Sequence, residues 1–175
     1  EHAILRSDVT AITNVRADHL DEMGKTLDEI AVSLSNTIPD HAAFFTADAA
    51  YFDFFKRQCE QKGTRAFLSS STQACLNHAL NETYRAIDFP DNVALALDIC
   101  AYLDVDKTKA LEGMKNYRKD PGCFTIISYR NEQKRTLFFI NTLAANDPQS
   151  TEIILQKAAA ARYWNNKRYL LINNR

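Results

Sequence analysis

Four polar side chains near the start of the chain are of the types that bind metal ions or phosphate groups. They follow a short apolar run at residues 9–12, and they are Arg16, Asp18, His19 and Asp21. A carboxylate or an imidazole can coordinate a divalent ion, and a guanidinium can pair with a phosphate. The alternative interpretation is that Asp18 or Asp21 caps backbone N–H groups at the start of a helix. The spacing of these residues by itself favours the cap.

The surrounding sequence places these side chains on a loop between a strand and a helix. Residues 9–13 are apolar and β-branched, which indicates a short buried strand. A helix is predicted after Thr26, because apolar residues recur at helical spacing, at Leu27, Ile30, Ala31, Leu34 and Ile38, until Pro39. Proteins of the α/β class place polar chemistry on such loops.

The rest of the chain alternates between strand and helix patterns, which predicts an α/β fold with a parallel sheet. The expected elements are a strand at 42–46, a helix at 48–62, a strand at 65–68, helices at 90–103 and 106–117, strands at 123–129 and 136–141, a helix from 148 and a strand at 168–172. The 42–68 segment forms a β-α-β unit, which is expected to be right-handed. The passage between domains is predicted at 115–134.

Composition excludes several classes of protein. The chain has 175 residues, 46% of them hydrophobic, and a net charge of −1, so it can bury a core but offers no broad basic surface for nucleic acid. No apolar run approaches the ~20 residues of a membrane span, and no signal peptide is evident. The four cysteines are scattered without paired spacing, which favours buried free thiols.

The segment Gly24-Lys25-Thr26 imitates the end of a phosphate-binding P-loop. That loop needs closely spaced glycines, and His19 stands where the first of them would be. The pattern from Thr26 to Glu29 instead predicts a capping box that opens the next helix. The P-loop interpretation is therefore rejected.

A wider pattern resembles a known family. Residues 13–21 are similar to the Asn-x-x-x-Asp-His-Leu-Asp segment of the ATP-dependent amide ligases of the Mur ligase and folylpolyglutamate synthase superfamily. Further segments resemble one branch, the ligase subunit of poly-γ-glutamate (capsule) synthase, and they occur in the family's order, at 24–31, 89–97, 113–114 with 120–122, and 139–151.

The resemblance implies a domain organisation. Residues 1–134 would be the carboxy-terminal part of a Mur-ligase-like central ATPase domain, and 135–175 the beginning of a Rossmann-like domain. Ligases of this superfamily carry a P-loop upstream of the Asp-His motif, so the chain is expected to be an internal fragment that does not catalyse alone. Asn146-Asp147 and Asn173-Asn174-Arg175 are expected at one carboxyl edge of that domain's sheet.

The implied chemistry is ATP-driven polymerisation of glutamate through γ-amide bonds. A substrate carboxylate attacks the γ-phosphate of ATP to give an acyl phosphate and ADP, and an incoming amine then displaces phosphate. The implied cofactors are ATP and Mg2+, with Mn2+ as a substitute. The implied partners are glutamate, the growing polymer and small membrane subunits at the cytoplasmic face of the membrane.

The resemblance also implies roles for individual residues. His19 carries over from a histidine that helps to hold the second metal ion, and Asp18 and Arg16 are the candidate catalytic residues. Asp18 and Asp21 either orient the His19 ring or cap a helix, one of each being favoured. Arg16 faces phosphate or the anionic polymer, or else forms a surface salt bridge.

Two further contacts with the nucleotide are implied. Asn92 aligns with an asparagine that binds adenine, although it could equally bind its own backbone. Asn146 and Asp147 would meet the nucleotide from the second domain, and they also suit the start of a helix at Pro148.

One departure separates the branches. Folylpolyglutamate synthases carry a carbamylated lysine in the helix after the Asp-His motif, and Leu34 stands at that position here. This disfavours the folate branch. The remaining alternatives are another Mur-type ligase, acting on folate or a peptidoglycan precursor, and a non-catalytic α/β interaction module.

Overall fold

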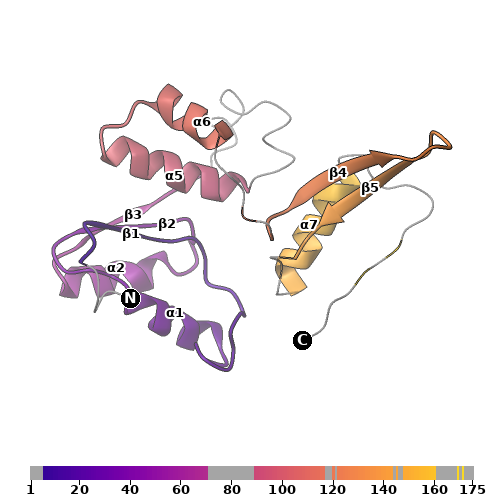
Figure 1. Cartoon of the computed structure of the whole chain (residues 1–175). Coiled ribbons are helices and arrows are strands. Elements are labelled where there is room, and N and C mark those ends of the chain that lie inside the picture. The colour runs from indigo at the N-terminus through magenta and orange to yellow at the C-terminus, as the bar shows by residue number, and fades with distance from the viewer. Residues whose placement is uncertain are drawn as a thin grey trace. The chain divides into compact units, whose positions relative to one another are not determined.

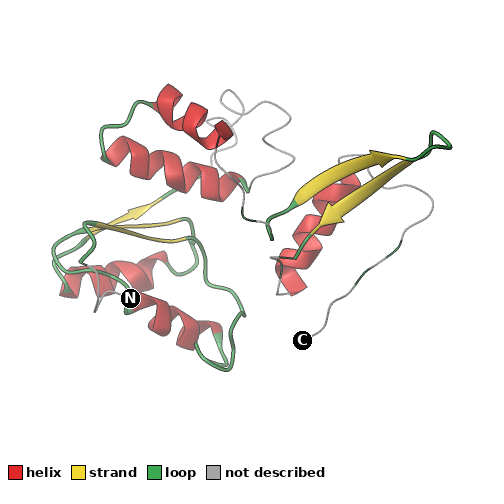
Figure 2. Ribbon diagram, viewed as in Figure 1, coloured by secondary structure: helices red, strands yellow, loops and turns green. Residues whose placement is uncertain are grey.

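The computed structural model describes residues 6–70, 89–116, 120, 122–143, 145, 148–160, 169 and 171. The chain divides into two compact units, Glu1–Tyr117 and Arg118–Arg175 (Figure 1). The prediction of an α/β protein with a parallel sheet is confirmed for the first unit, whose three strands and surrounding helices are shown in Figure 2.

The sheet of the first unit has three parallel strands. They are β1 (Val9–Ile12), β2 (Ala43–Thr46) and β3 (Arg65–Leu68), in the order β1-β2-β3. In this register Val9 lies opposite Ala43, and Ala43 lies opposite Arg65. The carboxyl ends of all three strands therefore meet at one edge of the sheet, and the loop that carries Asp18 and His19 leaves from that edge.

Helices cover both faces of the sheet (Figure 1). One core joins β2 to α1 (Leu27–Ser35) and α2 (Phe52–Gln61), and it includes Phe44 and Phe55, whose ring centroids are 5.4 Å apart. The other core joins β2 to α5 (Pro90–Tyr102), and there Phe45 stacks on Phe67 at 4.7 Å. The central strand is buried on both faces, as in other parallel sheets.

The helices agree with the predicted patterns except at some ends. The first helix was predicted to continue to Ile38, but α1 ends at Ser35, because the next amides bond three residues back and tighten the chain into turns. The helix predicted from 48 begins at Phe52, since the residues before it form a turn around Asp48.

The last two described helices of the first unit begin as predicted. Pro90 occupies the first turn of α5, where its missing N–H costs nothing. Asp106 caps α6 (Lys107–Asn116), because its Oδ1 accepts from the N–H groups of Thr108, at 3.0 Å, and Lys109, at 3.1 Å.

The second unit contains a β-hairpin and a helix. Strands β4 (Thr125–Arg130) and β5 (Thr136–Asn141) pair antiparallel, and α7 spans Pro148–Ala160. The hairpin joins residues on both sides of the domain boundary predicted at 134/135, which stays a prediction. The predicted strand at 168–172 lies outside the described residues, apart from Tyr169 and Leu171.

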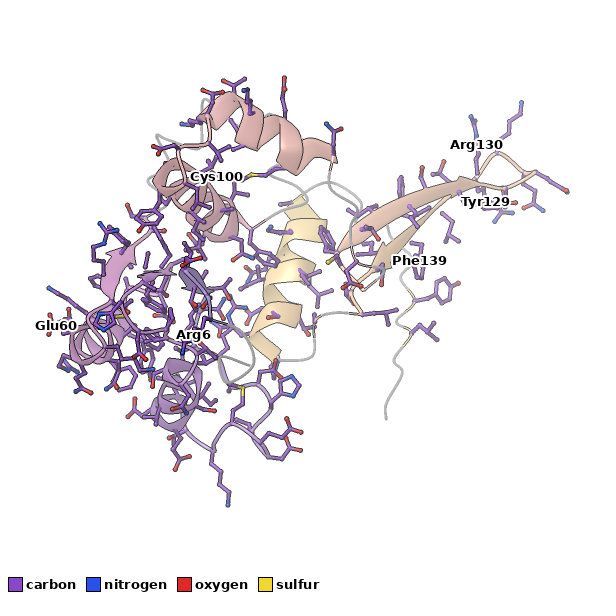
Figure 3. All side chains as sticks on the ribbon, turned by 60° about the vertical axis from the view of Figure 1, so that its left-hand side comes forward. Arg6, Glu60, Cys100, Tyr129, Arg130 and Phe139 are labelled. Carbon is purple, nitrogen blue, oxygen red and sulfur yellow. The ribbon has the colours of Figure 1, made fainter. Side chains whose placement is uncertain are left out.

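One face of the hairpin is apolar and exposed. Ile127 lies opposite Phe139, and Tyr129 lies opposite Leu137, so the four side chains share a face of the two-stranded sheet. Each is more than half exposed, from 52% for Phe139 to 64% for Tyr129. Tyr129 and Phe139 are labelled in Figure 3.

Candidate functional site

The loop between β1 and α1 is anchored to the core at both ends. Near its start the Val15 side chain is buried, and the Val15 N–H donates to Oδ2 of Asp48 at 2.8 Å. Near its end Met23 packs against the same core, and its N–H donates to the carbonyl oxygen of His19 at 2.8 Å. The residues between these anchors form a short polar turn at the carboxyl edge of the sheet.

Asp18 and His19 lie side by side on this turn. The N–H of His19 donates to Oδ1 of Asp18 at 2.8 Å, and Nε2 of the imidazole lies 3.7 Å from Oδ2. Both side chains reach solvent, with 58% of His19 and 37% of Asp18 exposed. Of the two predicted partners for the ring, Asp18 is the carboxylate that contacts it. The roles of Asp18 and His19 toward a metal ion stay predictions.

The backbone of His19 shapes the turn that carries both side chains. Its φ is +49°, a left-handed conformation that is uncommon for residues other than glycine. The His19 carbonyl oxygen accepts from both Glu22 and Met23, so the turn closes on itself. Upstream, the N–H of Asp18 donates to the carbonyl oxygen of Arg16 at 2.9 Å, and the half-buried Arg16 is thereby held in the same turn.

The donor set suits a hydrated divalent ion better than a closed metal site. Across the described ranges, no group of three or more His, Cys, Asp or Glu side chains is placed to hold a metal. Asp18 and His19 offer one carboxylate and one imidazole, both open to water. Magnesium commonly binds through one or two carboxylates and keeps several waters or phosphate oxygens. Asp18 offers such a carboxylate, whereas the imidazole of His19 is only a modest ligand for a hard ion such as magnesium.

The predicted capping box at the start of α1 is confirmed. Oγ1 of Thr26 accepts from the N–H of Glu29 at 3.2 Å, and Oε2 of Glu29 accepts from the N–H groups of Thr26, at 3.1 Å, and Lys25, at 2.6 Å. Gly24 has a φ of +129°, and a Cβ there would lie 2.4 Å from Cβ of Glu29. The backbone donors of Lys25 and Thr26 are thus occupied by Glu29, which supports the rejection of a P-loop here.

Sequence reasoning missed two residues of the turn between β2 and α2. Asp48 accepts from the N–H groups of Val15, Ala50 and Tyr51, and Tyr51 donates its hydroxyl to Oδ1 of Asp28 at 2.9 Å. Asp48 follows a buried strand and accepts from the N–H groups two and three residues on, which is the local pattern of an Asx-turn. Its bond to Val15 spans 33 residues of sequence and has no local signal.

Asn92 is exposed in the first turn of α5. Tyr102, at the other end of this helix, hydrogen-bonds through its hydroxyl to Arg65, the first residue of β3. Helix α5 therefore runs opposite to the strands, and its first turn points toward the carboxyl edge of the sheet. Asn92 and the Asp18–His19 turn thus lie toward the same edge, although α5 and α1 pack on opposite faces.

The remaining predicted contacts are not described. Asn146 and Asp147 lie outside the described residues, as do 172–175. Pro148 opens α7 as predicted. The roles of these residues toward a nucleotide stay predictions.

The described cysteines are free thiols, in agreement with the sequence. Cys59 is fully buried between α2 and the sheet, whereas Cys100 and Cys123 are partly buried. Burial raises the pKa of Cys59 to about 11, so its thiol stays protonated at neutral pH. Cys75 lies outside the described residues.

Comparisons with known proteins show relatives of one kind. Residues 126–175 match the family model described as the poly-gamma-glutamate synthase CapB C-terminal domain. Over all 175 residues the chain is 33% identical to the capsule biosynthesis protein CapB of Bacillus anthracis, covering 37% of that protein. It is 31% identical over 175 residues to the PGA synthase CapB of Bacillus subtilis (strain 168), covering 44% of it. No solved structure matches.

These results show that the chain is homologous along its whole length to part of CapB proteins. It spans less than half of the length of either relative, 37% of one and 44% of the other. Within the described parts of the chain, no helix is both long enough and apolar enough to cross a bilayer.

Proposed function

We propose that this chain is part of the ATP-dependent ligase of a poly-γ-glutamate (capsule) synthase, which joins glutamate residues through γ-amide bonds. The observation that carries the proposal is the homology over all 175 residues to two proteins named for capsule biosynthesis and PGA synthesis. Residues 1–134 would belong to a Mur-ligase-like ATPase domain and 135–175 to the beginning of a Rossmann-like domain. The three-stranded parallel sheet, covered by helices on both faces, supports the assignment of the first of these two domains.

The reaction consists of two displacements. The carboxylate of the growing polymer attacks the γ-phosphate of ATP, which gives an acyl phosphate and releases ADP. The amine of an incoming glutamate then attacks the acyl carbon and releases phosphate, so each added residue consumes one ATP. Both steps bring anions together, and their barriers fall when the protein orients the groups and places positive charge beside them.

The turn at 16–19 would provide part of this environment. His19 and Asp18 would hold a magnesium or manganese ion, which supplies positive charge to the phosphates when bound. The N–H of His19 donates to Oδ1 of Asp18, and Oδ2 of Asp18 lies 3.7 Å from Nε2 of His19, so both side chains would meet the same hydrated ion. Arg16, held in the same turn, would pair with a phosphate or with the anionic polymer.

The nucleotide would lie along the carboxyl edge of the sheet. Asn92, in the first turn of α5, would contact the adenine, because a carboxamide both donates to and accepts from a purine edge. Asn146 and Asp147 would contact the nucleotide from the second domain. A phosphate-binding loop would come from sequence outside these 175 residues, so the 175 residues alone are expected to be inactive.

The proposal includes the setting of the enzyme. Glutamate and the growing poly-γ-glutamate are the substrates, and small membrane subunits hold the ligase at the cytoplasmic face of the membrane. We propose no nucleic-acid partner for these 175 residues, whose net charge of −1 predicts no broad basic surface.

A steady-state assay of the full-length protein with its membrane partners tests the proposal. It follows glutamate-dependent ADP release and polymer formation, with wild type compared with His19→Ala and Asp18→Asn. Glu22→Gln is the matched control, because Glu22 is exposed on the same turn. We expect turnover to collapse in His19→Ala, to fall in Asp18→Asn and to persist in the control.

Other outcomes would contradict part or all of the proposal. Turnover that survives His19→Ala would retain the ligase but remove the metal role of His19. A single addition of glutamate instead of a long polymer would indicate a folate or peptidoglycan ligase. ATP turnover without any glutamate dependence, or no nucleotide binding at all, would contradict the poly-γ-glutamate ligase.

A further inference from the structure

We propose that Asp48 and Tyr51 are positioning residues for the loop that carries Arg16, Asp18 and His19. The inference rests on the proposed function, because it assigns the turn between β2 and α2 the task of holding the metal-binding turn in place. Neither residue touches the reacting groups in this proposal. Both act through hydrogen bonds to the segments that flank the loop.

Asp48 fixes the start of the loop. Its two carboxylate oxygens accept three backbone N–H groups, with Oδ2 receiving Val15 at 2.8 Å and Oδ1 receiving Ala50 at 3.0 Å and Tyr51 at 3.2 Å. The backbone N–H of Asp48 donates in turn to Oγ1 of Thr46, a fully buried residue at the end of β2. The carboxylate therefore joins the first residues after β1 to the residues that follow the central strand.

Tyr51 fixes the far end. Its hydroxyl donates to Oδ1 of Asp28, in the first turn of α1, and its ring packs against the core shared by α1 and α2. The pKa of Tyr51 is raised, first by desolvation, then by the hydrogen bond to Asp28 and by the nearby carboxylates of Asp28 and Asp48. The hydroxyl thus remains a donor through neutral and mildly alkaline pH.

The two contacts hold the ends of one segment from a single turn. Val15 lies one residue before Arg16, and Asp28 lies two residues after the capping residue Thr26. The intervening turn reaches solvent and carries the strained left-handed residue His19. Without these ties the turn would sample other conformations, and the imidazole and carboxylate would meet a metal ion in the right geometry less often.

This arrangement predicts a specific effect on metal use. Removing a group that bonds directly to a metal ligand commonly weakens metal affinity or activity by ~10–100-fold. Asp48 acts one step further out, through the backbone of Val15, so the lower end of that range is expected. Asp48→Asn removes the charge and leaves only one acceptor oxygen for three donors, so we expect the half-saturating Mg2+ concentration to rise about 10-fold. Tyr51→Phe keeps the ring packing and loses only the hydroxyl, so a smaller rise is expected.

The experiment uses the full-length protein with its membrane partners. The Mg2+ dependence of ADP release is measured for wild type, Asp48→Asn, Tyr51→Phe and the control Asp53→Asn, which neutralises an exposed acid in the first turn of α2. Amide hydrogen exchange of residues 15–23 is measured on the same samples. Faster exchange together with a raised Mg2+ requirement in Asp48→Asn and Tyr51→Phe, and neither change in Asp53→Asn, would support the inference.

Two results would overturn it. One is unchanged exchange in 15–23 for either variant, since the contact would then not hold the loop. The other is faster exchange with an unchanged Mg2+ requirement, since the loop geometry would then not matter for metal use. If Asp48→Asn fails to fold, Tyr51→Phe decides alone. A wild-type enzyme without glutamate-dependent ADP release would instead contradict the proposed function, and the exchange data would still test the contact.

Discussion

At Gly24 the addition of a single methyl group is expected to destabilise the fold. Gly24→Ala adds one methyl group at a φ of +129°, where residues with a side chain are strained by about 1–3 kcal/mol. The new Cβ would also lie 2.4 Å from Cβ of Glu29, so Glu29 must move. Its carboxylate would then weaken its bonds to the N–H groups of Lys25 and Thr26, which costs about 1 kcal/mol.

The sum is a loss of roughly 2–4 kcal/mol in the free energy of unfolding. Urea denaturation followed by far-ultraviolet circular dichroism measures it. Gly113→Ala is the matched control in the same compact unit, because Gly113 lies inside α6 and a Cβ there would meet nothing within 4 Å. That substitution is expected to stabilise by about 0.5–1 kcal/mol, since alanine loses less backbone entropy in a helix.

The opposite signs of the two glycine substitutions are the test. If the free energy of unfolding of Gly24→Ala lies within about 0.5 kcal/mol of wild type, neither the backbone conformation nor the close approach to Glu29 carries the expected cost. A stable Gly24→Ala protein that lost ATP binding would also contradict the structural role of Gly24, because it would restore the phosphate-loop interpretation of residues 24–26.

Three other predictions concern the core, a buried thiol and the hairpin turn. Phe44→Ala empties a fully buried site on the central strand and should cost about 3–5 kcal/mol, whereas the exposed Ile127→Ala should cost less than about 1 kcal/mol in the same unfolding assay. Cys59 should resist a thiol reagent at pH 8 in the folded protein and react in urea. Burial raises the pKa of Cys59 from 9.0 to about 11, so the protonated thiol contributes its full stabilisation below pH 9. This contribution should decline as the pH rises from 9 to 11, and denaturation at several pH values would detect the decline. Lys134, in the hairpin turn with a φ of +58°, should gain about 0.5–1 kcal/mol on replacement by glycine, and equal or lower stability of that variant would contradict the assigned turn strain.

Local signals predicted most of the elements. The apolar residues of β3 and the apolar and β-branched residues of β5 predicted both strands with the observed bounds, and Thr26 with Glu29 predicted the capping box. These features depend on residues a few positions apart. The differences at the end of α1 and the beginning of α2 arose where local periodicity continued beyond the hydrogen-bonded helix.

The residues of the candidate site also differ in whether the local sequence could predict their role. The polar turn with Asp18 and His19 was predicted from the family resemblance, which lies within a short segment, whereas the spacing of its residues by itself favoured a helix cap. Asp48 was not found, because its bond to Val15 joins the ends of two strands that are neighbours only in the folded sheet. Asn92 and the His19 turn likewise belong to segments more than 70 residues apart, and the direction of α5 was needed to place them toward one edge.

The sequence by itself determined which of the described segments become helices and strands, how α1 is capped, and which short turn carries side chains of the types that bind metal ions. These follow from side-chain periodicity and from hydrogen bonds between near neighbours, which do not depend on the rest of the chain. The tertiary structure alone decided that Asp18 is the carboxylate beside His19 and that Asp48 and Tyr51 hold the loop. Those contacts depend on the strand order β1-β2-β3 and on backbone conformations that packing imposes.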